Sequence, residues 1–313
     1  MTLAIGIDLG GTQVRAALID AAGVVMARAA DATDVVGGPA RVLDQMRRLV
    51  AEVCAGISPD SVEAAGVCAP GPLDSETGTV LDIPTLPGWR DFPLRDALAD
   101  SLKMPVVLEN DGIAAAYGEW KYGAGRGLRH LVYVTVSTGI GGGVVMDGRL
   151  LHGRRGMAAH VGHMPMDLNG PICSCGGVGC FEALAAGPAF GRAGRAMAER
   201  GGLLAALTET VEARHVVDAA RLGDSGAMRL IELEAEYLGV GFTGLIHLYS
   251  PERIIMGGGM SAAFDLLDTG MHAVIRGRAM PAFRDVTVVR AALGDNSGLV
   301  GAAAMALSRE ARD

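Results

Sequence analysis

Residues 7–20 read IDLGGTQVRAALID, and the strand–turn–strand pattern of this stretch indicates an α/β fold. It joins an apolar run over residues 3–9 to a second apolar run over 14–19 through a glycine turn. A third strand is predicted over 24–29, after the turn DAAG. Three consecutive strands predict an antiparallel meander, and glycines in its first turn would let the backbone approach a bound phosphate closely.

Helices and strands alternate after this meander, and the second half of the chain partly repeats the first. The predicted helices lie at 39–54, 92–102, 112–123, 225–248, 262–276 and from 297, and the predicted strands at 62–68, 106–109, 131–136, 141–146, near 150, 253–256 and 286–290. Each half opens with a strand, a glycine-rich turn and another strand. Duplicated βββαβα units in an α/β chain are therefore predicted.

The chain has 313 residues, half of them hydrophobic, which is enough for two folded lobes. We expect an N-terminal α/β lobe over 1–117 and a larger C-terminal α/β lobe over 118–313. The second lobe would carry an inserted loop at about 152–182, and the last helix would pack back on the N-terminal lobe.

Charge and cysteine content exclude several classes of protein. The net charge of −8 disfavours a nucleic-acid partner, which would normally require a basic face. The N-terminal MTLAIGIDLGG lacks the regions of a signal peptide, and no apolar run reaches membrane-spanning length. Five cysteines, three of them crowded together, indicate metal chemistry in a reducing compartment rather than a disulfide framework. A cytoplasmic protein without a membrane partner is expected.

Three glycine turns share one design, because each follows an apolar strand: DLGGTQ (8–13), STGIGGG (137–143) and MGGG (256–259). One such turn is usually a hairpin, but three favour a site that handles phosphoryl groups, and the spacing matches neither a P-loop nor a dinucleotide fingerprint. The predicted nucleotide-binding residues are Asp8, Gly10, Gly11, Thr12, Gln13, Thr138, Gly139, Gly257, Gly258 and Gly259.

Two aspartates are candidates for chemistry at these turns. Asp8 precedes the first turn, where a carboxylate could hold a hydrated Mg²⁺ that bridges nucleotide phosphates, or could simply begin the turn. Asp111 follows a predicted buried strand and would suit a general base that accepts a proton from an alcohol. The alternative is that Asp111 caps the helix that follows.

The segment 160–182, HVGHMPMDLNGPICSCGGVGCFE, contains a candidate metal site. His163, Cys173, Cys175 and Cys180 have the spacing H-x9-C-x-C-x4-C, and three thiolates with one imidazole form a closed tetrahedral set typical of structural zinc. A redox site would favour C-x-x-C, which this segment lacks. Sequence alone leaves open whether His160 is a partner of the ligands, a substrate contact or a surface residue.

Five segments together resemble the ROK family of repressors and sugar kinases. They are IDLGGTQVRAALID, LENDGIAAAYGE, VTVSTGIGGGVV, GHMPMDLNGPICSCGGVGCFEALAAG and IIMGGGM, and the resemblance spans nearly the whole chain. It implies a two-lobed actin/hexokinase-like fold that closes on ATP and a sugar. It also implies a zinc ion held by His163 and the three cysteines, and a homodimer or homotetramer.

The resemblance further implies the roles of individual residues. Asp111 matches the base that takes the proton from the sugar C6 hydroxyl, the first two glycine turns match those that hold ATP phosphates, and the third lies near the adenosine. The positions that match sugar contacts are Gly71, Thr85, Asn110, His160, His163 and Glu182. From the residues alone, Glu182 could equally be the first acidic residue of the next helix.

Three positions depart from the commoner family pattern. Ala159 and His160 stand where family glucokinases usually have Gly-Glu, and this histidine resembles that of bacterial N-acetylmannosamine kinases. Thr85 replaces a frequent Asn, and Gln13 replaces a frequent Lys. The imidazole offers one donor and one acceptor where a glutamate only accepts, so we expect an altered preference at the sugar C2 group.

The expected activity is therefore ATP-dependent phosphorylation of a hexose or N-acylhexosamine, leaning to N-acetylmannosamine, with glucose as the alternative. A catalytically silent sugar sensor or a repressor is the remaining alternative. Family repressors carry a helix-turn-helix domain before DLGGT, whereas here that motif begins within ten residues of Met1.

Overall fold

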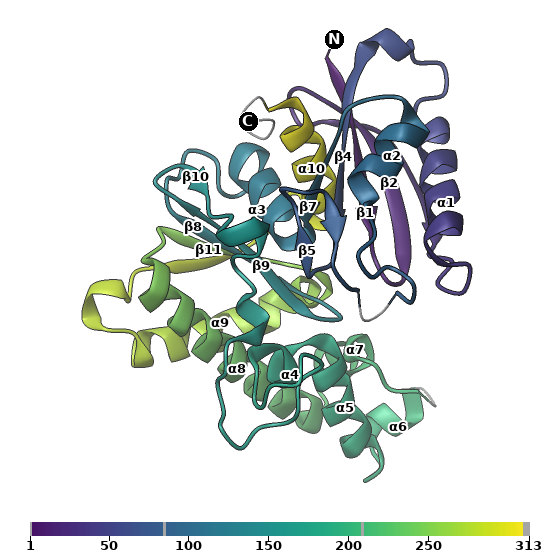
Figure 1. Ribbon diagram of the computed structural model, residues 1–313. Helices are drawn as coiled ribbons and strands as arrows, with labels where there is room; N and C mark the ends of the chain where they lie inside the picture. Colours follow the sequence, from purple (N-terminus) through teal and green to yellow (C-terminus); the bar gives the residue numbers. More distant parts are fainter. Residues whose placement is uncertain (1, 84–85, 208–209, 309–313) are drawn as a thin grey trace. The chain divides into compact units, whose positions relative to one another are not determined.

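The computed structural model describes residues 2–83, 86–207 and 210–308, which form two compact units (Figure 1). Unit 1 comprises Met1–Leu128, Gly143–Ala159 and Ala292–Asp313, and unit 2 comprises Arg129–Gly142 and His160–Ala291. Residues 118–128, 143–159 and those from 292 onward, which the division at 117/118 assigns to the second lobe, thus belong to unit 1.

Unit 1 is built on a five-stranded sheet in the order β3-β2-β1-β4-β7. Its strands are β1 (Leu3–Leu9), β2 (Gln13–Asp20), β3 (Val25–Ala32), β4 (Val62–Ala69) and β7 (Val106–Asn110). The first three form the predicted antiparallel meander, while β1, β4 and β7 are parallel. The carboxyl ends of these parallel strands therefore meet at one edge.

Two helices pack on each face of this sheet. α1 (Gly38–Val53) and α2 (Leu94–Leu102) lie against the face formed by the odd-numbered side chains of β1. The other face packs against α10 (Ser297–Leu307), which also packs on α3 (Asp111–Tyr122). Alternation of side chains along the strands explains this division into two apolar layers.

Two glycines let α10 approach the sheet closely. A Cβ atom at Gly6 would lie 2.1 Å from the carbonyl oxygen of Leu299, and one at Gly66 would lie 1.9 Å from that of Ala302. Any larger side chain at either strand position would therefore push the helix away. This contact seats the first turn of α10 over the carboxyl ends of β1 and β4.

Unit 2 contains most of a second five-stranded sheet, in the order β10-β9-β8-β11-β12. Its strands are β8 (Leu131–Val136), β9 (Ile140–Met146), β10 (Arg149–Leu150), β11 (Arg253–Gly257) and β12 (Thr287–Arg290). The order repeats that of the first sheet, as the predicted duplication requires. The helices of unit 2 are α4 (Phe181–Ala185), α5 (Gly187–Ala198), α6 (Leu203–Leu207), α7 (Ala213–Arg221), α8 (Ser225–Tyr249) and α9 (Phe264–Arg278).

The sequence predictions give no bounds for the helices α4 to α7. Several short elements were also not predicted from the sequence. They are the hairpin of β5 (Leu73–Asp74) and β6 (Thr79–Val80) and six 3-10 turns at Pro59–Ser61, Arg154–Gly156, Val161–His163, Gly259–Ala263, Pro281–Phe283 and Gly294–Asn296. The longer predicted helices and strands are confirmed to within about two or three residues at each end. Within the described ranges, no helix is long and apolar enough to cross a membrane.

A buried carboxylate on α3 fastens the chain where it returns to unit 1. Glu119 is fully buried and accepts hydrogen bonds from the N–H groups of Ala124 (2.8 Å), Ala292 (3.0 Å) and Leu293 (2.8 Å). It also accepts one from the hydroxyl of Ser297 (2.8 Å). Both oxygens thus accept two hydrogen bonds each, and the Ser297 hydroxyl among the donors is itself buried.

Replacing Glu119 with alanine is expected to lower the free energy of unfolding by about 3 kcal/mol or more, because four hydrogen bonds to one charged group are lost. Urea unfolding followed by circular dichroism measures this change. The matched control is Glu52→Ala on the exposed side of α1, which should change stability by no more than about 0.5 kcal/mol. Equal effects of the two substitutions would contradict the role given to Glu119.

Candidate functional site

The predicted site residues of unit 1 gather at the carboxyl edge of its sheet. Asp8 lies near the end of β1, Gly71 follows β4, Asn110 ends β7 and Asp111 begins α3. The first glycine turn, residues 10–13, joins β1 to β2 at the same edge. The sheet therefore brings these positions together, as expected for the ligand-binding edge of a parallel sheet.

Asn110, rather than Asp111, is the N-cap of α3. Its side-chain oxygen accepts hydrogen bonds from the N–H groups of Gly112 (3.0 Å) and Ile113 (3.4 Å). The half-buried carboxylate of Asp111 accepts a hydrogen bond from the Gly112 N–H through Oδ1 (2.8 Å). Because Asn110 caps the helix, Asp111 is not needed as the N-cap, and its other oxygen is available for chemistry.

The environment of Asp111 favours its neutral form. Burial, and then the negative charge of Asp8, raise the pKa of Asp111 from its ordinary 3.8 to about 7. A carboxyl group that titrates near neutral pH can accept a proton from a substrate and later release it to solvent. This is the electrostatic property that a general base requires.

The first glycine turn is braced by Thr33. The hydroxyl of Thr33 donates to the carbonyl of Gly10 (2.7 Å), and its N–H donates to the carbonyl of Thr12 (3.0 Å). The Gly10 N–H donates to the carbonyl of Gln13 (2.9 Å) within the turn. Thr12 and Gln13 are exposed, so the tip of the turn is open to a ligand.

A row of polar side chains crosses the sheet beneath this turn, and sequence reasoning missed it. Arg15 of β2 stands opposite Asp8, Asp8 stands opposite Cys68 of β4, and Cys68 stands opposite Glu109 of β7. Arg15 forms an ion pair with Asp8. The buried Cys68 thiol hydrogen-bonds to Asp8. Burial, first, and then the charges of Asp8 and Asp111 raise the pKa of this thiol.

Glu109, the last residue of this row, fixes the backbone of Asn110. The buried Glu109 accepts a hydrogen bond from the Asn110 N–H through Oε1 (2.7 Å) and lies 3.2 Å from Nε2 of His152 through Oε2. The hydrogen bond with Glu109 raises the pKa of His152. The pair therefore holds the backbone immediately before Asp111, and both members belong to unit 1.

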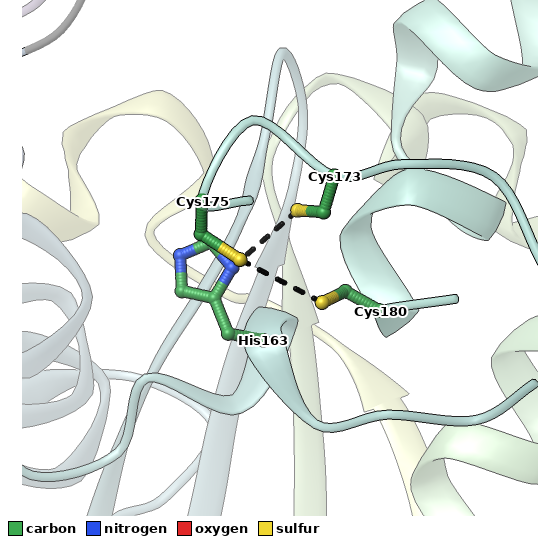
Figure 2. Close-up of side chains that lie close together, drawn as sticks. All are labelled: His163, Cys173, Cys175 and Cys180. Carbon is green, nitrogen blue, oxygen red and sulfur yellow. Dashed lines mark hydrogen bonds between the residues drawn. The ribbon is translucent and has the colours of Figure 1, made fainter. Parts of the chain in front are cut away.

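The four predicted metal ligands converge in unit 2. His163 ends the short turn Val161–His163, Cys173 and Cys175 lie on the loop that follows, and Cys180 precedes α4 (Figure 2). Their ligand atoms all lie within 4.8 Å of one another. Nδ1 of His163 faces Cys173 at 3.7 Å, and the Sγ atoms of Cys175 and Cys180 are also 3.7 Å apart.

These separations fit a tetrahedral zinc ion. Bond lengths of about 2.3 Å to sulfur and 2.0–2.1 Å to nitrogen place two sulfur ligands about 3.8 Å apart, and a sulfur and a nitrogen about 3.6 Å apart. The two distances of 3.7 Å lie close to both values. Thiolate-rich sets of this size select zinc over magnesium or calcium.

Glu182 connects this cluster to the second glycine turn. Its Oε1 accepts a hydrogen bond from the hydroxyl of Ser174 (3.0 Å) and lies 3.8 Å from Sγ of Cys173. Its Oε2 accepts one from the N–H of Ile140 (3.0 Å), and a Cβ atom at Gly139 would come within 2.6 Å of it. The cysteine loop and the turn are therefore braced by one carboxylate, a link that the sequence did not reveal.

The third glycine turn packs against the second. A Cβ atom at Gly258 (φ +79°) would lie 2.5 Å from the carbonyl oxygen of Val136, and one at Gly257 would lie 2.1 Å from the Tyr133 hydroxyl. A Cβ atom at Gly259 would meet the hydroxyl of Ser137 at 3.5 Å. Only glycine fits the first two positions, so this turn lies directly beside the exposed Ser137 and Thr138.

Two predicted sugar contacts remain, His160 and Thr85, and only His160 lies among the described residues. His160 is exposed and precedes the turn that carries His163, with the two rings stacked at 6.3 Å between centroids. Ala159 before it has a φ of +59°, a region that favours glycine. Thr85 lies outside the described residues.

Comparison with known proteins identifies the family. The sequence profile of the ROK family matches residues 4–309. The chain belongs to the ROK family. A glucokinase of Thermotoga maritima is 37% identical, with 97% of each chain covered, and an N-acetylmannosamine kinase of Yersinia pseudotuberculosis is 33% identical, with 96% of each covered.

The fold of this ROK protein is also that of a solved relative. A ROK family glucokinase from Streptomyces griseus, crystallised with glucose and AMPPNP, has a TM-score of 0.88 and 34% identity over 97% of this chain and 99% of its own. The predicted actin/hexokinase-like α/β fold is therefore confirmed.

Proposed function

We propose that this ROK protein uses ATP to phosphorylate the C6 hydroxyl of a hexose or N-acylhexosamine. Glucokinase relatives at 35–37% identity over nearly the whole chain make it a phosphotransferase with an alcohol acceptor. The observation that carries the reaction is the carboxyl of Asp111, whose pKa is raised to about 7 at the ligand-binding edge of the sheet. A general base at neutral pH is what transfer to a sugar hydroxyl needs.

Each part of the reaction falls to a described residue. Asn110, fixed by Glu109 and by its cap on α3, orients a sugar hydroxyl beside Asp111. Asp111 accepts the hydroxyl proton as the oxygen bonds to the terminal phosphorus of ATP, and the bond from that phosphorus to the bridging oxygen breaks, so that ADP leaves. The backbone of the glycine turns donates to the phosphate oxygens, because exposed N–H groups at such turns form anion sites.

The two implied metals fit their proposed sites unequally. His163 and the three cysteines fit zinc, which would fix the loop that carries Glu182. Asp8 fits magnesium poorly, since Arg15 and Cys68 already donate to its carboxylate. Magnesium would therefore arrive as part of the nucleotide substrate, and no step is assigned to Asp8 as its ligand.

N-acetylmannosamine is the sugar favoured by His160. An exposed imidazole at this position can donate to an N-acyl oxygen, which a glutamate cannot do. Glucose is the alternative, since glucokinases are prominent among the relatives. A homodimer or homotetramer stays a prediction.

A panel of sugars tests both the reaction and its specificity. We expect ATP turnover with N-acetylmannosamine to exceed that with glucose, N-acetylglucosamine, mannose, fructose and allose. The substitution His160→Glu should move the ratio of kcat/KM toward glucose by about tenfold or more, because one hydrogen bond to a charged group is worth about 1.5–3 kcal/mol.

The outcomes separate the alternatives. If none of the sugars supports ATP turnover, the kinase proposal is wrong, and a catalytically silent sugar sensor remains as the alternative. A strong preference of the unaltered protein for glucose would instead overturn only the role given to His160. His215→Glu, at a histidine outside the predicted site, is the matched control and should leave the ratio unchanged.

A further inference from the structure

Arg15 occupies a fixed place directly below the first glycine turn. Its Nη2 donates to Oδ2 of Asp8, and its Nη1 donates to the carbonyl of Asp295 (3.1 Å). The strand register places Arg15 opposite Asp8, with one residue pair, Leu9 and Val14, between them and the turn. The guanidinium is thus held between a carboxylate and a backbone carbonyl, with 22% of its side chain exposed.

Asp8, in contrast, is enclosed by protein groups. Only 11% of its side chain is exposed, the Cys68 thiol hydrogen-bonds to it, and a Cβ atom at Gly298 would lie 3.8 Å from Oδ2. Magnesium demands near-octahedral coordination by open oxygen ligands and keeps several waters. A carboxylate already bound by an arginine and a thiol does not provide such a ligand.

We propose that Arg15 binds the nucleotide phosphates at the first glycine turn and that Asp8 positions Arg15 rather than coordinating Mg²⁺ directly. The inference rests on the proposed function, since it assumes a nucleotide at this turn. In this arrangement the positive charge beside the phosphates comes from the Arg15 guanidinium and not from a metal ion held by Asp8.

The geometry of the guanidinium supports this role. Among the contacts of the described residues, Arg15 uses two of its five N–H groups, so others remain for phosphate oxygens. Planar, bidentate donation is what makes arginine suited to phosphate recognition. The first turn of α10, which lies beside Asp8 at Gly298, adds the positive end of an eleven-residue helix to the same region.

A purely structural ion pair would behave differently from a phosphate-binding arginine. Loss of a structural pair would weaken nucleotide and sugar binding alike, through a loosened sheet edge. Loss of a phosphate contact would weaken nucleotide binding alone. Asp8 as a metal ligand would give a third result, a raised Mg²⁺ requirement that does not depend on Arg15.

The test uses the full chain and the variants Arg15→Gln, Arg15→Lys, Asp8→Asn and the double variant Asp8→Asn/Arg15→Gln. Isothermal titration calorimetry measures the affinity for ADP without Mg²⁺, for AMPPNP with Mg²⁺ and for the sugar. Titration of kinase activity with Mg²⁺ gives the concentration for half-maximal rate. Arg28→Gln is the matched control, because Arg28 is an exposed arginine on the neighbouring strand β3.

We expect Arg15→Gln to weaken ADP binding in the absence of Mg²⁺ by about ten- to hundredfold, with sugar affinity unchanged within about twofold. Arg15→Lys should lose less ADP affinity, because lysine keeps the positive charge but lacks the planar pair of N–H donors of a guanidinium. Asp8→Asn should weaken ADP binding similarly, and the double variant should lose no more than Arg15→Gln alone. The Mg²⁺ concentration for half-maximal rate should stay near that of the unaltered protein. The affinities of the Arg28→Gln control should also match those of the unaltered protein.

A loss of sugar affinity as large as the loss of ADP affinity in Arg15→Gln would indicate a structural ion pair and overturn the inference. Two further results would also overturn it. One is unchanged ADP affinity in Arg15→Gln or, if that variant does not fold, in Arg15→Lys. The other is a tenfold or larger rise in the Mg²⁺ requirement of Asp8→Asn alone. Failure of the proposed function shows separately, as absence of sugar phosphorylation by a protein that still binds ADP.

Discussion

Replacing Asp111 with asparagine is expected to lower kcat by about 10²–10⁴-fold, the usual contribution of a positioned general base. Asparagine keeps the shape of the side chain and can still accept from the Gly112 N–H, but it cannot take up the proton of the sugar hydroxyl. Sugar and nucleotide affinities should change little, because Asn110 and the glycine turns are untouched.

Steady-state kinetics and calorimetric binding of the sugar measure these two effects separately. The matched control is Asp82→Asn, at a half-buried aspartate whose contact is an ion pair with Arg90. That variant should keep nearly full activity. Full activity of Asp111→Asn would show that the proton goes elsewhere.

The same substitution is expected to stabilise the protein at neutral and alkaline pH. The pKa of Asp111 is raised to about 7, so the folded state binds this proton more tightly than the unfolded state. The resulting stabilisation is complete below the ordinary pKa of 3.8 and is lost as pH rises through 7. Asparagine does not titrate, so the difference in unfolding free energy between variant and parent should grow in favour of the variant from pH 5 to pH 8.

The expected growth is up to about 3 kcal/mol at 1.36 kcal/mol per pKa unit. Urea unfolding at the two pH values measures it. A difference independent of pH would mean that Asp111 titrates in its ordinary range and is not poised as a base. Kinetics and stability therefore test one electrostatic property by two routes.

The sequence predicted well what depends on neighbouring residues. The apolar run that became β1 (Leu3–Leu9), the helical spacing behind α1 and the cysteines grouped before α4 are all local signals. The position of Asp111 at the end of a buried strand also followed from a local pattern. These features need no knowledge of which strands pair.

Contacts between distant segments could not be predicted in this way. The Arg15–Asp8 pair could have been suspected by counting outward from the glycine turn, since the two stand opposite each other in the hairpin. The contact of Glu109 with His152 and that of Glu182 with Ile140 depend on how loops return to the sheet. The hairpin of β5 and β6 was missed because two-residue strands have no periodicity.

Removing the metal from the cysteine cluster is expected to have the second large effect. The protein as purified should contain about one zinc ion per chain, measured by inductively coupled plasma mass spectrometry, because the donor set and its spacings fit tetrahedral zinc. A strong chelator should lower the melting temperature and raise the KM for the sugar. The sugar effect follows because His163 is both a ligand and a predicted sugar contact.

The KM for ATP should rise as well, by about ten- to hundredfold, since a hydrogen bond to a charged group is worth about 1.5–3 kcal/mol and 1.4 kcal/mol corresponds to a factor of ten. The physical link is Glu182, which accepts hydrogen bonds from Ser174 on the cysteine loop and from Ile140 in the second glycine turn. A loop freed by loss of the ion would no longer hold Glu182 against that turn. Readdition of Zn²⁺ should restore both KM values.

Substitutions separate the ion from the carboxylate. Cys180→Ser should lose zinc and raise both KM values, whereas Cys54→Ser, at a half-buried cysteine at the end of α1, should change neither. Glu182→Gln should keep the zinc yet still raise the KM for ATP, because the amide presents one acceptor oxygen where the carboxylate uses two. Two results would contradict the coupling between the zinc site and nucleotide binding. One is a purified protein that contains no zinc, because the ion would then hold nothing in place. The other is a Glu182→Gln variant with unchanged nucleotide kinetics, because Glu182 would then not link the cluster to the glycine turn.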